Sequence, residues 1–195
     1  MKKVFTILAI ALLASTSTFA QKYFTRTGKV TFFSDTKMED IKADNNKTNV
    51  VLDATTGAVE ISLLIKSFEF EKALMQEHFN ENYMESDTYP KASFKGKVDN
   101  MSAVNLKKDG TYNATATGDM TMHGVTKKIT INVTFKVVGG KITGETKFYI
   151  VPEDYNIKIP NTVRDNIASK IEVTATAVLE ELKKEPTSDH VVQSY

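Results

Sequence analysis

Residues 111–122, TYNATATGDMTM, and the following residues 129–137, ITINVTFKV, decide the fold. In the first stretch Ala114, Ala116, Met120 and Met122 share one side of an extended chain, and polar residues, mainly threonine, occupy the other side. The second stretch alternates in the same way, with a large apolar residue at every second position. A period of two turns one set of side chains toward a core and the other toward solvent. Both stretches therefore predict strands of a sheet that buries one face.

Other parts of the chain repeat this alternation and are separated by turn residues. Further rows run through residues 30–32, 59–65, 142–150 and 171–179. Glycine supplies the positive φ of tight hairpins, and it occurs between rows in the pairs Thr56-Gly57, Asp109-Gly110 and Gly139-Gly140. Successive hairpins give an up-and-down order, and about eight strand candidates suit a small closed barrel. We therefore predict an all-β fold over residues 21–182, an antiparallel up-and-down eight-stranded lipocalin-like β-barrel.

One segment departs from the period of two. Between Glu71 and Met84, apolar and aromatic side chains recur close to every 3.6 residues, with charged residues between them. Pro90 ends any helical continuation nearby. The pattern predicts one inserted amphipathic helix, whose apolar side holds Leu74, Met75, His78, Phe79 and Tyr83.

Small residues stand among the large ones in the inward rows, and they bear on whether the barrel is hollow. Small side chains on several strands leave space for an apolar ligand, and methionines give such a space an adaptable lining. Alternatively, the small residues lie where strands or the helix approach closely, and the interior is filled. The pattern leaves both interpretations open. For a hollow barrel we expect an apolar lining of Phe68, Phe70, Leu74, Met75, Phe79, Ala114, Ala116, Met120, Met122, Ala175 and Ala177.

Composition and missing motifs exclude several classes of function. The chain has 25 Lys and Arg against 24 Asp and Glu, which is not the basic balance of a nucleic-acid-binding protein. It has no Cys, so disulfides, thiol nucleophiles and thiolate metal sites are excluded. Nucleophile-elbow, phosphate-loop, dinucleotide and zinc-protease motifs are missing. His78 and His123 lie far apart in the sequence, whereas a zinc site needs three or four converging ligands. We expect no catalytic residue, no metal and no cofactor.

Both ends of the chain are predicted to lie outside the barrel. Lys2-Lys3, the apolar run Val4–Ala14 and small residues up to Ala20 form the pattern of a bacterial signal peptide, and the run is shorter than the roughly 20 residues of a membrane span. Cleavage near Ala20 removes these two lysines and takes the net charge from +1 to −1. We expect a periplasmic or secreted protein that does not span a membrane. Residues 183–195 are polar and aperiodic, which predicts a flexible tail.

Two motifs resemble the YceI-like family of lipid- and polyisoprenoid-binding proteins. Residues 73–98, ALMQEHFNENYMESDTYPKASFKGKV, are similar to the family's helix-to-strand segment, in which a His and an aromatic residue precede a Tyr-Pro pair. Residues 118–128, GDMTMHGVTKK, resemble its G-x-L-T-x-x-G-V-T-K signature, with Met120 in the Leu position. The chain departs from the family at residues 26–33, RTGKVTFF, and at Asp154-Tyr155-Asn156. At Asn156 a turn with positive φ remains accessible.

The resemblance implies a lipocalin-like barrel whose long apolar tunnel holds an isoprenoid or fatty chain, and it implies export to the periplasm. We therefore expect a binding protein, not an enzyme, that carries, stores or sequesters an apolar lipid or protects the envelope under stress. At the mouth, a polar head group would meet His78, Tyr83, His123 and Arg164. The alternatives are a structural or stress-related envelope protein with a filled barrel and an enzyme for small substrates that uses His78 or His123 as a general base. A monomer and a homodimer both remain open.

Overall fold

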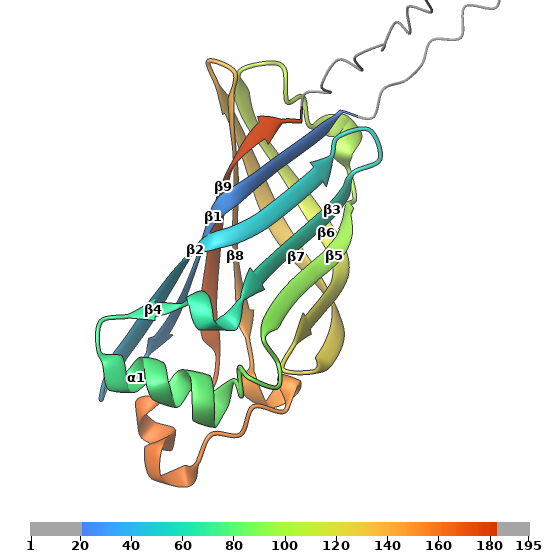
Figure 1. Cartoon of the computed structure of the whole chain (residues 1–195). Helices are drawn as coiled ribbons and strands as arrows, with labels where there is room; N and C mark the ends of the chain where they lie inside the picture. Colours follow the sequence, from blue (N-terminus) through green and yellow to red (C-terminus); the bar gives the residue numbers. More distant parts are fainter. Residues whose placement is uncertain (1–20, 183–195) are drawn as a thin grey trace, which may run out of the picture.

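The computed structural model describes residues 21–182, so the predicted signal peptide, residues 1–20, and the predicted tail, residues 183–195, lie outside the described residues. The elements are almost all strands (Figure 1). They are β1 (Lys22–Asp35), β2 (Asp40–Asp53), β3 (Ala58–Leu64), β4 (Glu69–Phe70), β5 (Lys91–Val98), β6 (Gly110–Met122), β7 (Val125–Val138), β8 (Lys141–Ile150) and β9 (Ile171–Glu181). The short helix α1 (Ala73–His78) continues into a π-helical turn, Phe79–Tyr83, and 3-10 turns span Ile65–Ser67, Met101–Ala103, Pro152–Tyr155 and Asn161–Asn166.

Eight of the strands close into a ring, and every neighbouring pair is antiparallel. The hydrogen-bonded order is β1-β2-β3-β5-β6-β7-β8-β9, and β9 pairs back onto β1. The two-residue strand β4 lies outside the ring order and pairs with the start of β2. The predicted fold, an up-and-down eight-stranded antiparallel barrel, is confirmed. The alternating rows predicted from the sequence also keep their register, because Ala116 pairs with Ile131 and Gly144 with Ala177.

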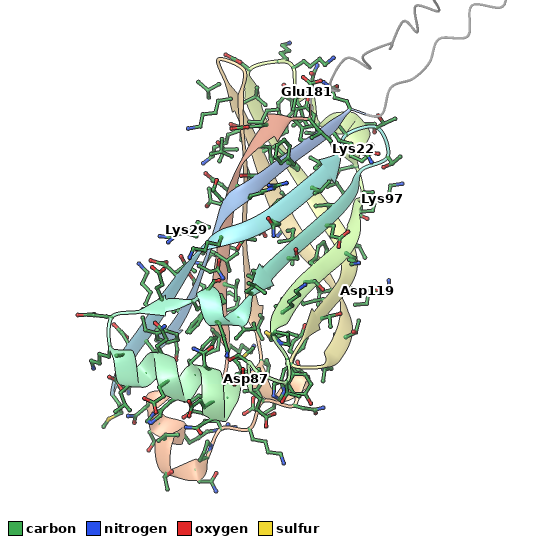
Figure 2. The ribbon with its side chains drawn as sticks, in the orientation of Figure 1. Lys22, Lys29, Asp87, Lys97, Asp119 and Glu181 are labelled. Carbon is green, nitrogen blue, oxygen red and sulfur yellow. The ribbon has the colours of Figure 1, made fainter. Side chains whose placement is uncertain are left out.

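The two ends of the barrel differ in what covers them. Long connections at residues 65–90 and 151–170 carry α1 and three 3-10 turns and lie together at one end, which we call the helix end (Figure 1). At the opposite end the described chain begins and finishes, and Lys22 and Glu181 lie there in Figure 2. Met101, Val104 and Leu106, from the connection between β5 and β6, are buried there in the main hydrophobic core. That core therefore fills the barrel at the end opposite α1.

The inserted helix is shorter than predicted. The sequence pattern predicts a helix over residues 71–84, but α1 stops at His78 and the chain widens into a π-helical turn. Met75 and Phe79, one turn apart, face the barrel, whereas the side chain of Leu74 is 61% exposed. Leu74 was expected in the lining, and this expectation is wrong. It lies about 100° around the helix from Met75, which a short helix that packs along a single row cannot also bury.

A pair of glycines brings β5 and β6 unusually close. Gly96 and Gly118 are directly opposite in the register. A Cβ on Gly118 would lie 2.4 Å from the carbonyl oxygen of Lys95 and 2.5 Å from the Cα of Gly96. A Cβ on Gly96 would lie 2.8 Å from the ring of Phe94. Because these two residues have no side chains, the backbones of β5 and β6 and the Phe94 ring can approach one another closely. This agrees with the interpretation that the small inward residues lie where strands approach closely.

Replacing Gly118 by Ala tests this close approach. We expect Gly118→Ala to lower the free energy of unfolding by about 2 kcal/mol, because backbone atoms must move to admit the methyl group. Gly144→Ala is the matched control, since its Cβ would find only ordinary contacts, the nearest at 3.6 Å from Phe135. Urea denaturation of both variants measures the difference. Equal stability of the two variants would contradict the interpretation.

The carboxylate of Asp44 on β2 interacts with Thr31 and Lys29 on β1 and so links the two strands. The hydroxyl of Thr31 donates to its carboxylate, and the ammonium of Lys29 lies 3.2 Å away. Lys42 lies 3.9 Å from the same carboxylate. The hydrogen bond from Thr31, and then the neighbouring lysines, hold the pKa of Asp44 below its ordinary value. A carboxyl whose pKa is lowered by folding stabilises the fold only while it is ionised.

Asp44→Asn should therefore cost stability in a pH-dependent way. Above the ordinary pKa of a free Asp we expect the variant to be less stable by about 0.5 kcal/mol, a value reduced by partial exposure. The difference should disappear as the pH falls through the lowered pKa of Asp44, where the wild-type carboxylate also becomes neutral. Chemical denaturation across a pH series measures it. A difference that persists into strongly acidic solution would show that charge is not its cause.

Candidate functional site

A cavity of about 280 Å³ occupies the barrel at the helix end. Its wall is almost entirely apolar and comes from every strand of the ring except β7, together with the connection that carries α1 and the connection after β8. The larger side chains include Val30, Leu63, Ile150 and Val173 from the strands. An apolar cavity of roughly 150 Å³ already admits a small hydrocarbon ring, so this space is sufficient for part of an apolar ligand.

Four phenylalanines form one side of the cavity. Phe32 comes from β1, Phe68 precedes β4, Phe70 is the last residue of β4, and Phe79 begins the π-helical turn. Phe32 lies 5.2–5.5 Å from the rings of the other three, measured between centroids, and Phe70 lies 5.0 Å from Phe79. These tilted and stacked pairs hold α1 against the barrel, because each ring packs on at least one other. The sequence pattern predicts Phe32 only as part of a strand, although its place in a period-two row also indicates that it points inward.

The connection between β8 and β9 closes another side of the cavity. Ile157, Ile159, Val163 and Ile167 contribute apolar side chains from a segment without regular alternation. At Asn156 φ is +59°, so the turn expected there is present. The guanidinium of Arg164 bonds the carboxylate of Glu153 and links the two 3-10 turns. The backbone N–H of Glu153 itself, and then Arg164, lower the pKa of Glu153.

The polar part of the cavity wall gathers at the helix end. It consists of Ser34 and Glu39 near the β1–β2 turn, His78 and Tyr83 beside α1, and Asn166 after the 3-10 turn. Glu39 forms a 2.8 Å ion pair with Lys72, and this hydrogen bond raises the pKa of Lys72. Ser34 accepts a hydrogen bond from the backbone N–H of Ala168 at 2.9 Å. Within residues 21–182, the side chains of the cavity wall that could hydrogen-bond the polar end of a ligand therefore lie only at the helix end.

A second, much smaller cavity of about 70 Å³ lies further along the barrel. Ala116, Ala175 and Ala177 line it, with Phe94 and Phe135. The ring of Phe135 lies 3.6 Å from where a Cβ of Gly144 would be. Large rings therefore occupy most of the space that the small residues leave. The resemblance implied a long tunnel, whereas this interior is filled in one half and hollow in the other.

The predicted lining residues separate into distinct places. Those in the wall of the larger cavity are Phe68, Phe70, Met75, Phe79, Met120 and Met122, together with His78 and Tyr83 from the predicted mouth. Ala116, Ala175 and Ala177 line the smaller cavity, Ala114 is in the filled core, and Leu74 is exposed. Arg164 is absent from the cavity wall, because its guanidinium is bound to Glu153. A role in ligand binding stays a prediction for the residues that line either cavity.

His123 is held in a tight turn and not in the cavity wall. It is 8% exposed, and with Gly124 it forms the β6–β7 turn, with positive φ at both residues. Its Nδ1 lies 3.0 Å from the carbonyl oxygen of Tyr155, and its Nε2 lies 2.9 Å from the Glu85 carboxylate. Both ring nitrogens are thus engaged with protein atoms. His123 was expected at the mouth, but contacts with the two long connections hold its ring in place and it does not belong to the cavity wall.

Across residues 21–182, no three His, Asp or Glu side chains converge closely enough to hold a metal ion. Nor does this range contain a helix that is long and apolar enough to cross a membrane.

Comparison with known proteins identifies the family. The model of the YceI-like domain matches residues 11–179. The chain belongs to the YceI-like family. No curated protein sequence matches it significantly.

Solved structures with the YceI-like fold resemble the chain closely in shape. A polyisoprenoid-binding domain from Saccharophagus degradans, implicated in plant cell wall breakdown, gives a TM-score of 0.71 at 16% identity and covers 83% of this chain and 98% of its own. BcnA of Burkholderia cenocepacia gives a TM-score of 0.64 at 17% identity, covering 78% of this chain and 96% of its own. At such identities the likeness shows the fold.

The two YceI-like motifs meet at one point of the structure. Tyr89, from the helix-to-strand motif, packs its ring 4.5 Å from the ring of His123 in the second motif. A Cβ on Gly124 would lie 2.7 Å from the same Tyr89 ring, so only glycine fits there. Tyr155 contributes its carbonyl oxygen to His123, and burial raises the pKa of its phenol. The motif residues therefore join the helix-end connections to the β6–β7 turn.

Removing the imidazole tests this structural role of His123. We expect His123→Asn to lower the free energy of unfolding by about 2 kcal/mol, because asparagine accepts a positive φ but cannot reach both the carbonyl of buried Tyr155 and the Glu85 carboxylate. His78→Asn is the matched control and should change stability little, since His78 is exposed. Thermal and urea denaturation measure both. If the two substitutions cost the same, His123 does not hold the connections together.

Proposed function

We propose that this protein binds a single-chain apolar lipid, such as a polyisoprenoid or a fatty-acid derivative, in the larger cavity. The observation that carries the proposal is a cavity of about 280 Å³ with an apolar wall and a few polar side chains at one end. Ligand sites in proteins commonly have this composition, with apolar walls for affinity and a few polar groups for orientation. The chain of the lipid would lie among the phenylalanines and branched side chains, and its polar end would meet Glu39, His78 or Asn166.

The binding energy in this proposal comes from burial. Each methylene transferred from water into the cavity contributes about 0.8 kcal/mol before the costs of association. The volume is at the lower limit of the roughly 300–1,000 Å³ that small-molecule sites occupy. We therefore propose a ligand chain of moderate length, or the end segment of a longer chain.

Export and a carrier role belong to the same proposal. The signal-peptide pattern of residues 1–20 supports export to the periplasm or secretion. An exported protein that encloses a lipid chain can transport it, store it, or protect the envelope under stress. The family fold is compatible with each of these roles.

Two alternatives remain as outcomes of an experiment. A structural protein with a filled barrel would have no large cavity, whereas here one half of the interior is hollow. An enzyme using His78 or His123 would need a free ring nitrogen at the site, and both nitrogens of His123 are engaged. Native mass spectrometry of the protein purified from its own host tests all three roles. A co-purifying lipid supports the proposal, and its absence supports the filled or catalytic alternative.

A paired substitution on β9 tests whether the larger cavity is the site. Val173 is buried and lines the cavity, whereas Val178 on the same strand is 41% exposed on the outside. We expect Val173→Phe to weaken binding of a prenyl alcohol such as farnesol at least tenfold, because the ring occupies the cavity. Val178→Phe should leave binding unchanged. Isothermal titration of farnesol into both folded variants measures this, and equal affinities would place the site elsewhere.

A further inference from the structure

The wall of the larger cavity contains no Lys or Arg among the residues that the structure describes. Within residues 21–182, Glu39 brings the only carboxylate to this wall. The other polar side chains are the hydroxyls of Ser34 and Tyr83, the imidazole of His78 and the amide of Asn166. The polar end of a ligand that lies in this wall therefore meets hydrogen-bonding groups and one carboxylate, but no ammonium or guanidinium group.

Glu39 is held in place from two directions. It precedes β2, and its backbone N–H donates to the hydroxyl of Thr36 at 3.0 Å. Its Oε1 accepts a hydrogen bond of 2.8 Å from the ammonium of Lys72, the residue before α1. Its Oε2 has no hydrogen-bond partner within the described part of the chain. The side chain of Glu39 is 27% exposed, so water screens its charge only in part.

The two connections at the helix end add to this negative charge. Residues 65–90 and 151–170 carry nine Asp and Glu against five Lys and Arg. Of these five cations, Lys66, Lys72 and Arg164 each form an ion pair with a carboxylate. The chain without residues 1–20 has a net charge of −1, so the excess of negative charge is local. A field of this sign disfavours the approach of an anion to the helix end.

We propose that the ligand carries an uncharged head group that donates a hydrogen bond, such as an alcohol, and that Glu39 excludes carboxylate and phosphate head groups. This inference rests on the proposed function and specifies the ligand by its polar end. The hydroxyl of the ligand donates to the free oxygen of Glu39. An anionic head group would lose water and face a like charge, with no Lys or Arg in the wall to compensate.

A cationic head group gains little at the same place. The ammonium of Lys72 already compensates the charge of Glu39 and would have to be displaced. The selection proposed here therefore depends more on repulsion of the wrong head group than on strong attraction of the right one, which is a common source of specificity.

The experiment compares three ligands that share one straight chain: decanol, decanoate and decylamine. Each is titrated calorimetrically into the full mature chain at about pH 8, where imidazole groups are ordinarily uncharged. At this pH decanoate is an anion and decylamine is a cation. We expect decanol to bind roughly tenfold more tightly than decanoate, and at least as tightly as decylamine.

The variant Glu39→Gln tests the role of the carboxylate. Glutamine keeps the length of the side chain and an acceptor oxygen, but it removes the charge and releases Lys72 from its ion pair. We expect decanoate to bind roughly tenfold more tightly than to the wild type, because the like charge is gone. Decanol should bind roughly threefold more weakly, because a carboxylate is the stronger acceptor. General damage to the cavity would weaken both ligands and cannot produce opposite shifts.

Glu60→Gln is the matched control. Glu60 pairs with Lys95 at 3.1 Å, its side chain is 55% exposed, and it lies in the wall of neither cavity. The same chemical change there should leave the affinities of all three ligands unchanged. The comparison of the three ligands on the wild-type protein needs no variant, so it stands even if Glu39→Gln does not fold.

The outcomes separate head-group selection from the proposed function. A preference for decanol over decanoate that Glu39→Gln reduces and Glu60→Gln does not supports the inference. Decanoate that binds as tightly as decanol, or decylamine that binds more tightly, overturns the inference and leaves lipid binding intact. A preference for decanol that persists unchanged in Glu39→Gln overturns the role of Glu39. If the wild-type protein binds none of the three, the proposed function and the inference both fail.

Discussion

Closure of the sheet is the constraint on which the rest of the structure depends. Because β1 pairs with both β2 and β9, the inward side chains share a single enclosed volume of fixed width. An eight-stranded barrel is just wide enough for its own side chains to fill, or for one small ligand. Each inward position therefore contributes directly to the choice between a filled and a hollow interior. In an open sheet, another layer could compensate for a small residue.

The interior of the barrel is filled at one end and hollow at the other. Near the chain termini, large rings such as Phe94 and Phe135 cover the small residues, and the β5–β6 connection adds three more buried apolar side chains. At the helix end, the strands carry apolar residues whose side chains do not meet across the barrel, and two long connections complete the wall. The phenylalanine group and the contacts of His123 with Glu85 and Tyr155 help to hold these two connections in place.

The sequence was sufficient for the barrel because period-two alternation is a local signal. The rows in β6, β7, β8 and β9 are unbroken, and short turns with glycine set the register of the β6–β7 and β7–β8 pairs. In β2 the polar run Asn45–Thr48 interrupts the apolar pattern, so the strand could not be recognised from alternation. Asn45 is nevertheless fully buried, because its side chain forms hydrogen bonds with the backbone of Leu64 and Lys47. The cavity was harder to locate. Alternation shows which residues point inward, but it does not show whether a large side chain such as Phe135 or an empty space lies opposite Ala177. Residues 157–167 have no alternation, so their place in the cavity wall could not be predicted from it.

The pairing of the first and last strands has a practical consequence for handling the molecule. The backbone N–H of Leu182 donates to the carbonyl of Lys22 at 2.8 Å, so the two points where the described chain begins and finishes are neighbours. Both lie at the end opposite α1, away from the larger cavity (Figure 1). A label, an affinity handle or a surface tether attached at either point would hold the barrel upright with its ligand end facing outward. The same closeness makes the barrel a natural candidate for circular permutation, with new ends opened in a different hairpin.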